Sequence, residues 1–267
     1  MYETTSPSLC RIKVAHLYPT VMDVHGDARN VEVLRDRGQR RGIAVDIEDV
    51  EVGDRTDLSD ADLVFIGGGP DTAQTHVSSD LAARGPALRD LVEGGAACLA
   101  VGGGFQLFGN VHTTASGREI PGIGIFDVAS TEGPSRHTGE LVIETALGLP
   151  AGSALVSVAG FQDRAGVTEL GPCVRPLGTV VESTEPGPAN AFEGAVYGEA
   201  VGTYLHGPVL ANSPGLADHL LSAALRHRYG RGALSEGGDE ATPGSRVGPV
   251  REAVEKTDAP SGHRMAG

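Results

Sequence analysis

The residues with the clearest chemical potential lie where a short apolar stretch runs into glycine. Residues 96–101 have the small apolar side chains typical of a buried parallel strand, and Gly102, Gly103 and Gly104 follow before a helix that we expect to start near Phe105. This order of strand, turn and helix resembles a nucleophile elbow, in which a sharp turn lifts one reactive side chain above the sheet. Here the apex of the turn is Gly102, which has no side chain.

A histidine and a second glycine turn follow two other apolar stretches. His206 comes directly after residues 201–205, and three glycines at 67–69 come directly after residues 62–66. Open α/β sheets bind ligands at the carboxyl ends of their strands, where all of these residues are expected. Glycines allow backbone N–H groups to approach a substrate without interference from a Cβ atom. Taken alone, the glycines are also explained by a tight turn and His206 by an ordinary surface histidine. The prediction of a site therefore depends on finding these features together.

Three motifs together resemble those of class I glutamine amidotransferases of the cobyric-acid-synthase-like type. Residues 102–109, GGGFQLFG, are similar to the family signature C-G-G-[YF]-Q-L-[LF]-G and differ from it at the nucleophilic Cys. Residues 67–71, GGGPD, resemble the G-G-G-x-D/E loop that supplies an oxyanion N–H group. Residues 202–207, GTYLHG, match the motif that carries the catalytic base.

The resemblance implies a role for each matched residue. In this family a thiolate attacks the side-chain carboxamide of glutamine, a His transfers the proton, and released ammonia passes to a partner site. The catalytic positions are then Gly102, where the nucleophile is lost, and His206. Arg136 is similar to an Arg that binds the glutamine α-carboxylate, a task that suits its bidentate guanidinium, although a solvated loop Arg is an equal alternative. The implied substrate-binding residues are Arg136, Gly68, Gly69, Gly103 and Gln106, the last of which is also explained by packing at the helix start.

Two departures from the family pattern concern the residues around the base. The broader class carries a Glu two residues after the His, where this chain has Pro208. We therefore expect a dyad, or a carboxylate supplied from another chain. Residues 160–164, GFQDR, occupy the place of the family's G-F-E-N-H stretch, which we interpret as a loop that has diverged.

No cysteine of this chain is expected to replace the missing nucleophile. Cys98 lies four residues before the elbow on an extended strand, roughly 13 Å away at about 3.3 Å per residue. Cys10 and Cys173 have no motif around them, and three scattered cysteines indicate neither a disulfide framework nor a zinc site. We predict no metal ligands and no cofactor in this chain.

The amino-terminal part resembles one subfamily more closely. Leu17-Tyr18-Pro19, Gly26-Asp27 and Asn30-Val31 are similar to a pattern of GatD, the glutaminase subunit of lipid II isoglutaminyl synthase, and this resemblance extends over about residues 10–228. It implies a partner, a MurT-like Mur ligase that uses ATP and Mg²⁺ to amidate D-glutamate of lipid II. Three hypotheses follow: a glutaminase subunit, an inactive pseudo-glutaminase that positions the ligase, or an unrelated small-molecule binder on the same fold.

Composition narrows the classes of partner. The net charge of −14 over 267 residues argues against nucleic acid or an anionic membrane surface as the main partner. No apolar stretch reaches membrane-spanning length, so we expect a cytoplasmic protein without stable membrane insertion.

The order of expected elements predicts an α/β fold with a doubly wound, mostly parallel, flavodoxin-like sheet. Residues 10–230 are expected to form one amidotransferase-like domain, and residues 231–267, rich in Gly, Pro, Ser and charge, a disordered tail. A β-rich excursion is expected over residues 120–181. The expected strands of the sheet are 11–17, 43–50, 62–66, 96–101 and 196–205; the expected helices are 31–42, 81–93 (with a break at Gly85-Pro86) and 216–229; the short strands of the excursion are 141–144, 154–159 and 174–181.

Overall fold

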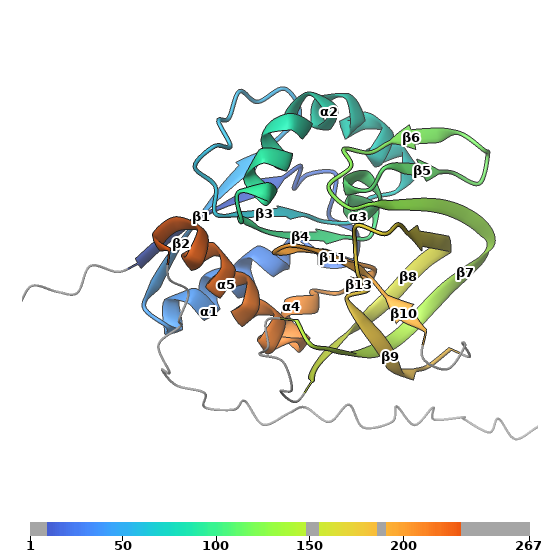
Figure 1. Cartoon of the computed structure of the whole chain (residues 1–267). Helices are drawn as coiled ribbons and strands as arrows, with labels where there is room; N and C mark the ends of the chain where they lie inside the picture. Colours follow the sequence, from blue (N-terminus) through green and yellow to red (C-terminus); the bar gives the residue numbers. More distant parts are fainter. Residues whose placement is uncertain (1–9, 148–154, 186–190, 231–267) are drawn as a thin grey trace, which may run out of the picture. The chain divides into compact units, whose positions relative to one another are not determined.

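The computed structural model describes residues 10–147, 155–185 and 191–230, which belong to one compact unit (Figure 1). The tail expected at residues 231–267 lies outside the described residues. The elements in chain order are β1 (Cys10–Leu17), a 3-10 turn (Val24–Gly26), α1 (Arg29–Arg40), β2 (Ile43–Val50), β3 (Leu63–Ile66), α2 (Asp71–Glu93), β4 (Ala97–Val101), α3 (Gly103–Phe108), β5 (Val111–Thr113), β6 (Glu119–Pro121), β7 (Val128–Thr145), β8 (Val156–Leu170), β9 (Gly178–Ser183), β10 (Phe192–Glu193), β11 (Ala195–Tyr197), β12 (Ala200–Thr203), β13 (Leu205–His206), α4 (Val209–Asn212) and α5 (Pro214–Tyr229).

The main sheet has six strands in the order β11-β12-β4-β3-β1-β2. All neighbours are parallel except the edge strand β11, which runs antiparallel to β12. Leaving out β11, the order is that of the flavodoxin-like doubly wound fold, which confirms the predicted fold class. Such a sheet collects the loops that follow β3, β4 and β12 at one edge.

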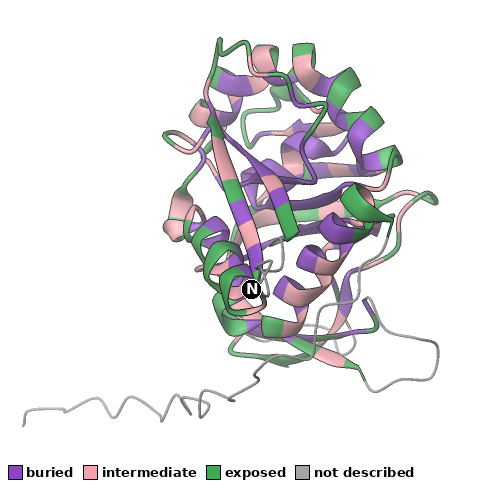
Figure 2. Ribbon diagram, turned by 90° about the vertical axis from the view of Figure 1, so that its left-hand side faces the viewer, coloured by how far each residue is buried: buried purple, intermediate pink, exposed green. Residues whose placement is uncertain are grey.

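Helices cover both faces of this sheet and divide the core into two parts. On one face α1 and α5 pack through residues such as Leu34 and Leu220, and on the other α2 and α3 pack through Leu81 and Phe105. Figure 1 shows α2 and α5 on opposite sides of the strands, and Figure 2 shows buried residues along the central strands and on the helix faces turned toward them. Because both faces are covered, the central strand β4 is buried throughout, as its unbroken apolar sequence predicts.

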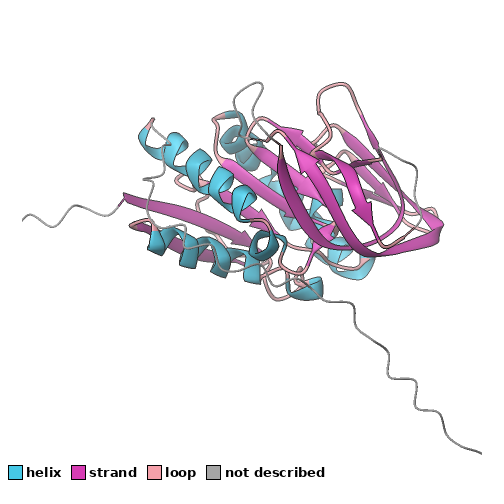
Figure 3. Cartoon of the chain, turned by 90° about the horizontal axis from the view of Figure 1, so that it is seen from below, coloured by secondary structure: helices cyan, strands magenta, loops and turns pink. Residues whose placement is uncertain are grey.

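A second, mixed sheet follows the elbow, and Figure 3 shows its long curved strands apart from most of the helices. The β-rich excursion is confirmed, but the strands expected at 141–144 and 154–159 are too short, and the one expected at 174–181 overlaps β9 only from residue 178. The first falls within β7 and the second overlaps the start of β8; these strands have 18 and 15 residues and form a long antiparallel hairpin. Residues 160–164, interpreted as a loop from the sequence, lie within β8. Turn-forming residues such as Gly139 and Gly166 misled the prediction, because strand pairing overrides local propensity.

Helix α2 begins ten residues earlier than expected and continues through the proline. Pro86 and Ala82 both lie on the solvent face of α2. In a regular helix the N–H group of residue 86 would donate to the Ala82 carbonyl, and proline has no such N–H group. Water can solvate that carbonyl, so no break is required. The early start matters for function, because it places the first turn of α2 directly after the glycines at 67–69.

Candidate active site

The three loops that follow β3, β4 and β12 meet at one edge of the main sheet. Register pairs Ile66 with Ala100, and Val101 with Thr203, so the three strands end at the same level. A cavity of about 410 Å³ opens above them. All of the predicted site residues line it, namely Gly68, Gly69, Gly102, Gly103, Gln106, Arg136 and His206.

Gly102 forms the sharp turn between β4 and α3. Its backbone has φ 53° and ψ −116°, a region that side chains rarely adopt. Its N–H group donates to Thr203 O over 2.8 Å, and its carbonyl accepts from Gln106 N, so the turn is fixed on both sides. A Cβ atom placed on Gly102 would lie 2.5 Å from His206 Cε1 and 2.9 Å from His206 Nε2. The elbow therefore points at the imidazole, whose ring lies against the space that a side chain at position 102 would need.

A buried carboxylate of the same chain orients His206. His206 Nδ1 lies 2.8 Å from Asp27 Oδ2, and Asp27 is fully buried. A carboxylate accepts the hydrogen bond at this contact, so Nδ1 carries a hydrogen, and Nε2 is the ring nitrogen on the side of the elbow. The expectation that no carboxylate of this chain bonds to His206 is wrong. Asp27 lies 179 positions before His206 in the chain. The sequence argument considered only position 208, close to His206, and therefore did not find it.

The same carboxylate also changes the prediction for the oxyanion site. Gly68 N donates to Asp27 Oδ2 over 2.9 Å, so this amide is already engaged and does not point freely into the cavity. Within the described residues, the N–H groups of Gly69 and Gly103 donate to no other group. Two of the three glycine amides therefore remain for an oxyanion.

The loop that carries Asp27 is held by its neighbour Asn30. The Asn30 side chain donates to the Asp27 carbonyl over 2.9 Å, and its own oxygen accepts from Leu210 N over 3.0 Å. Asn30 is fully buried, and these two hydrogen bonds satisfy both polar ends of its side chain. These bonds connect the loop before α1 to the segment after His206.

Arg136 lies in the cavity but is already bound. Its guanidinium makes a bidentate contact with Asp163, with Nε–Oδ1 and Nη2–Oδ2 distances of 2.6 and 2.7 Å. His25 Nε2 lies 2.8 Å from the same carboxylate, and the His25 ring packs edge-on against His206 at a centroid distance of 4.9 Å. The Arg136 guanidinium holds the pKa of Asp163 below its ordinary value. A carboxylate of the chain thus occupies the geometry in which a substrate carboxylate would bind.

The remaining candidates divide into those at the site and those away from it. Gln106 lines the cavity, and its Oε1 accepts from Gln74 Nε2 over 2.8 Å, so it is held at the helix start. Cys98 is buried inside β4, and burial raises the pKa of its thiol. Cys10 and Cys173 are exposed and do not line the cavity. Among the described residues that line it there is no thiol.

Glu193 is a further residue that sequence reasoning did not single out. It lies at the end of β10 and accepts hydrogen bonds from the Thr203 hydroxyl and, over 2.7 Å, from Tyr204 N. These residues directly precede His206, so Glu193 fixes the strand end that positions the imidazole. Burial raises the pKa of the Glu193 carboxyl to about 7. The partners are only 10 and 11 positions away, but a hydrogen bond of a buried side chain leaves no periodic signal that would have revealed this role.

The raised pKa of Glu193 predicts a specific dependence of stability on pH. Between the ordinary pKa of 4.5 and about 7, the folded chain holds a proton that the unfolded chain releases, so stability falls as the pH rises through this window. Glu193→Gln is expected to remove this loss, so that the variant gains up to about 3 kcal/mol relative to the wild type between pH 5 and pH 8. Urea unfolding of both proteins at several pH values measures the difference. A difference that stays constant with pH would contradict the assignment.

With the fold and the site in place, comparison with known proteins defines the class. A family model of CobB/CobQ-like glutamine amidotransferase domains matches residues 13–214, and the chain belongs to this family. A crystal structure of a glutamine amidotransferase, 18% identical and covering 79% of this chain and 98% of its own, superposes with a TM-score of 0.52, which supports the fold.

Two relatives bear the same name. The lipid II isoglutaminyl synthase (glutamine-hydrolyzing) subunit GatD of Streptococcus pneumoniae is 30% identical over 222 residues, covering 83% of this chain and 83% of that protein. The subunit GatD of Staphylococcus aureus is 28% identical over 219 residues, covering 81% of this chain and 86% of that protein.

Within the described part of the chain, none of the helices has both the length and the apolar character of a membrane span.

Proposed function

We propose that this chain is the amidotransferase-type subunit of a lipid II isoglutaminyl synthase, and that it positions a ligase subunit without hydrolysing glutamine. The names of its relatives and their coverage of most of the chain support the first part. In this proposal the partner is a MurT-like ligase, which binds ATP and Mg²⁺ and amidates D-glutamate of lipid II. The ATP and Mg²⁺ are assigned to the partner and not to this chain.

The observation that carries the second part is the elbow itself. Gly102 lies directly against His206, in the place where a nucleophile would stand, and no thiol lines the cavity within the described residues. Without a nucleophile, His206 has no group to deprotonate other than water. The pairing of Arg136 with Asp163 adds support, because it withholds a cation that a glutamine carboxylate would need.

The alternative is an active glutaminase subunit that delivers ammonia from glutamine to the ligase. The intact His206–Asp27 pair favours this alternative, since it preserves the base and its orienting carboxylate. A buried carboxylate and an imidazole also stabilise the fold through their hydrogen bonds, so their presence alone does not require catalysis. The two functions therefore differ in one measurable property, the nitrogen donor.

A coupled assay with the ligase subunit decides between them. The full-length chain and a co-expressed MurT-like ligase are supplied with lipid II, ATP and Mg²⁺, and amidation is followed with either ammonium or glutamine. We expect ammonium to support amidation and glutamine to give only background, with no ammonia released from glutamine. Amidation with glutamine at a rate near that with ammonium would establish the alternative. Failure of the two chains to associate would contradict the proposed subunit role.

A further inference from the structure

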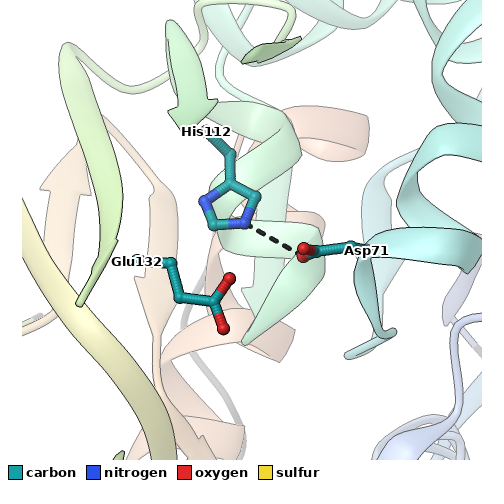
Figure 4. A group of neighbouring side chains, drawn as sticks. All are labelled: Asp71, His112 and Glu132. Carbon is teal, nitrogen blue, oxygen red and sulfur yellow. Dashed lines mark hydrogen bonds and ion pairs between the residues drawn. The ribbon is translucent and has the colours of Figure 1, made fainter. Parts of the chain in front are cut away.

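A second group of polar side chains lines the same cavity and takes no part in the proposed function. Asp71 lies in the first turn of α2, His112 on β5 and Glu132 on β7 (Figure 4). His112 Nε2 is 3.1 Å from Asp71 Oδ1, and one ligand atom from each of the three residues lies within 4.8 Å of the others. Three elements far apart in the chain thus bring one imidazole and two carboxylates together.

A bulge in β7 helps to place Glu132. The pairing of β7 with β8 shifts register between Thr131 and Arg136, and Glu132 lies in this irregular segment. Such bulges re-aim side chains and occur often beside active sites. Glu132 Oε2 accepts from Ala115 N over 2.7 Å, which holds the carboxylate at the edge of the cavity.

The charges of this cluster are not balanced by the chain. Within the described residues, neither Asp71 nor Glu132 forms an ion pair with a lysine or arginine. The Arg136 guanidinium forms its bidentate contact with Asp163 and not with Glu132. The amino end of α2 favours the carboxylate in its own first turn, but Glu132 lies on another element. Two carboxylates held this close favour a bound cation.

We propose that Asp71, His112 and Glu132 bind a divalent cation, with Zn²⁺ as the preferred ion. A mixed set of imidazole nitrogen and carboxylate oxygens suits Zn²⁺, and sites with three protein ligands keep a further position open to the cavity. The His112 side chain is only 4% exposed, so its orientation is fixed by packing. His112 Nδ1 has no partner within the described residues, so binding is expected to be weaker than at a site whose histidine is held by a second group. This proposal does not depend on the assignment of the elbow.

The test measures zinc binding by the full chain. The protein is stripped with a chelator, dialysed and titrated with Zn²⁺ against a chromogenic zinc indicator, and its melting temperature is followed with and without the ion. We expect one equivalent to bind and the melting temperature to rise, because the ion joins α2, β5 and β7. Glu132→Gln and Asp71→Asn, which preserve side-chain size, are each expected to weaken binding more than about tenfold and to remove the thermal shift.

Matched variants on the same helix test specificity. His76→Ala and Glu93→Gln alter exposed residues of α2 and are expected to leave the stoichiometry and affinity unchanged. Anomalous scattering at the zinc edge should place a single peak among the three side chains. The proposal is overturned if no equivalent binds, or if Glu132→Gln and Asp71→Asn, folded by circular dichroism, bind zinc as the wild type does.

Discussion

Gly102→Cys is expected to release ammonia from glutamine at least about 10²-fold faster than the wild type, whose rate we expect to equal background. The new sulfur would lie beside His206 Nε2, the ring nitrogen on the side of the elbow. An adjacent base of this kind activates a thiol. Ammonia release at saturating glutamine, measured with the ligase subunit present, gives the comparison.

The same substitution is expected to cost stability. A Cβ atom at position 102 would lie 2.5 Å from His206 Cε1, so the ring must withdraw while Asp27 continues to hold it. The positive φ of 53° adds backbone strain, and together we expect a loss of about 1–3 kcal/mol in the free energy of unfolding. Thermal or urea unfolding measures this loss.

Gly102→Ala is the matched control for both effects. It introduces the same Cβ atom without sulfur, so it should lose similar stability and gain no activity. If Gly102→Cys released ammonia no faster than Gly102→Ala, even when Asp163→Ala is added to free the Arg136 guanidinium, the assignment of the elbow as the nucleophile position would be wrong. The double variant Gly102→Cys/His206→Ala should return to background, because no base remains beside the thiol.

Asp27→Ala is expected to destabilise the chain by about 1–3 kcal/mol for each buried donor that loses its acceptor. Its carboxylate is fully buried and accepts from both Gly68 N and His206 Nδ1. Removing it leaves two buried donors without an acceptor. Equilibrium unfolding in urea measures the loss.

Asp27→Asn separates orientation from stability. The asparagine keeps the size of the side chain and its amide oxygen can still accept at the place of Asp27 Oδ2, but it lacks the negative charge of the carboxylate, so its hold on His206 should weaken. We expect the ¹⁵N shifts of His206 to change, and the Gly102→Cys activity to fall to background when both substitutions are combined. Asp23→Asn, an exposed residue of the same loop that accepts from Ala28 N, should cost no more than about 1 kcal/mol. An Asp27→Asn variant that left the His206 spectrum unchanged would contradict the positioning role.

The departures from the family pattern fit one interpretation of the cavity. Asp163 binds Arg136 and His25, and His25 packs against His206. The absence of a sulfur at Gly102 is therefore accompanied by a second feature, an Arg136 guanidinium that a carboxylate of the chain already binds. Both features support the proposed non-hydrolysing subunit.

The sequence by itself determined the sheet, the elbow and the place of the site. Unbroken apolar strands followed by glycine predicted the parallel core, and local motifs predicted that residues 67–69, Gly102 and His206 would meet, because the carboxyl ends of parallel strands share one edge. These signals lie within short stretches of sequence, so they can be recognised without knowledge of the fold. The long strands β7 and β8 were less accessible, since their stability comes from pairing with each other across many residues.

Only the tertiary structure decided which groups act on His206 and which are already engaged. Asp27 and Asp163 reach the site from segments distant in sequence, and Glu193 reaches it from a strand nearby in the chain. Their hydrogen bonds depend on burial and on direction, neither of which a residue type encodes. The same holds for Asp71, His112 and Glu132, which share no motif and are joined only where three elements converge. A polar contact between distant segments does not change the local pattern of helix-forming or strand-forming residues, so the sequence alone does not reveal it.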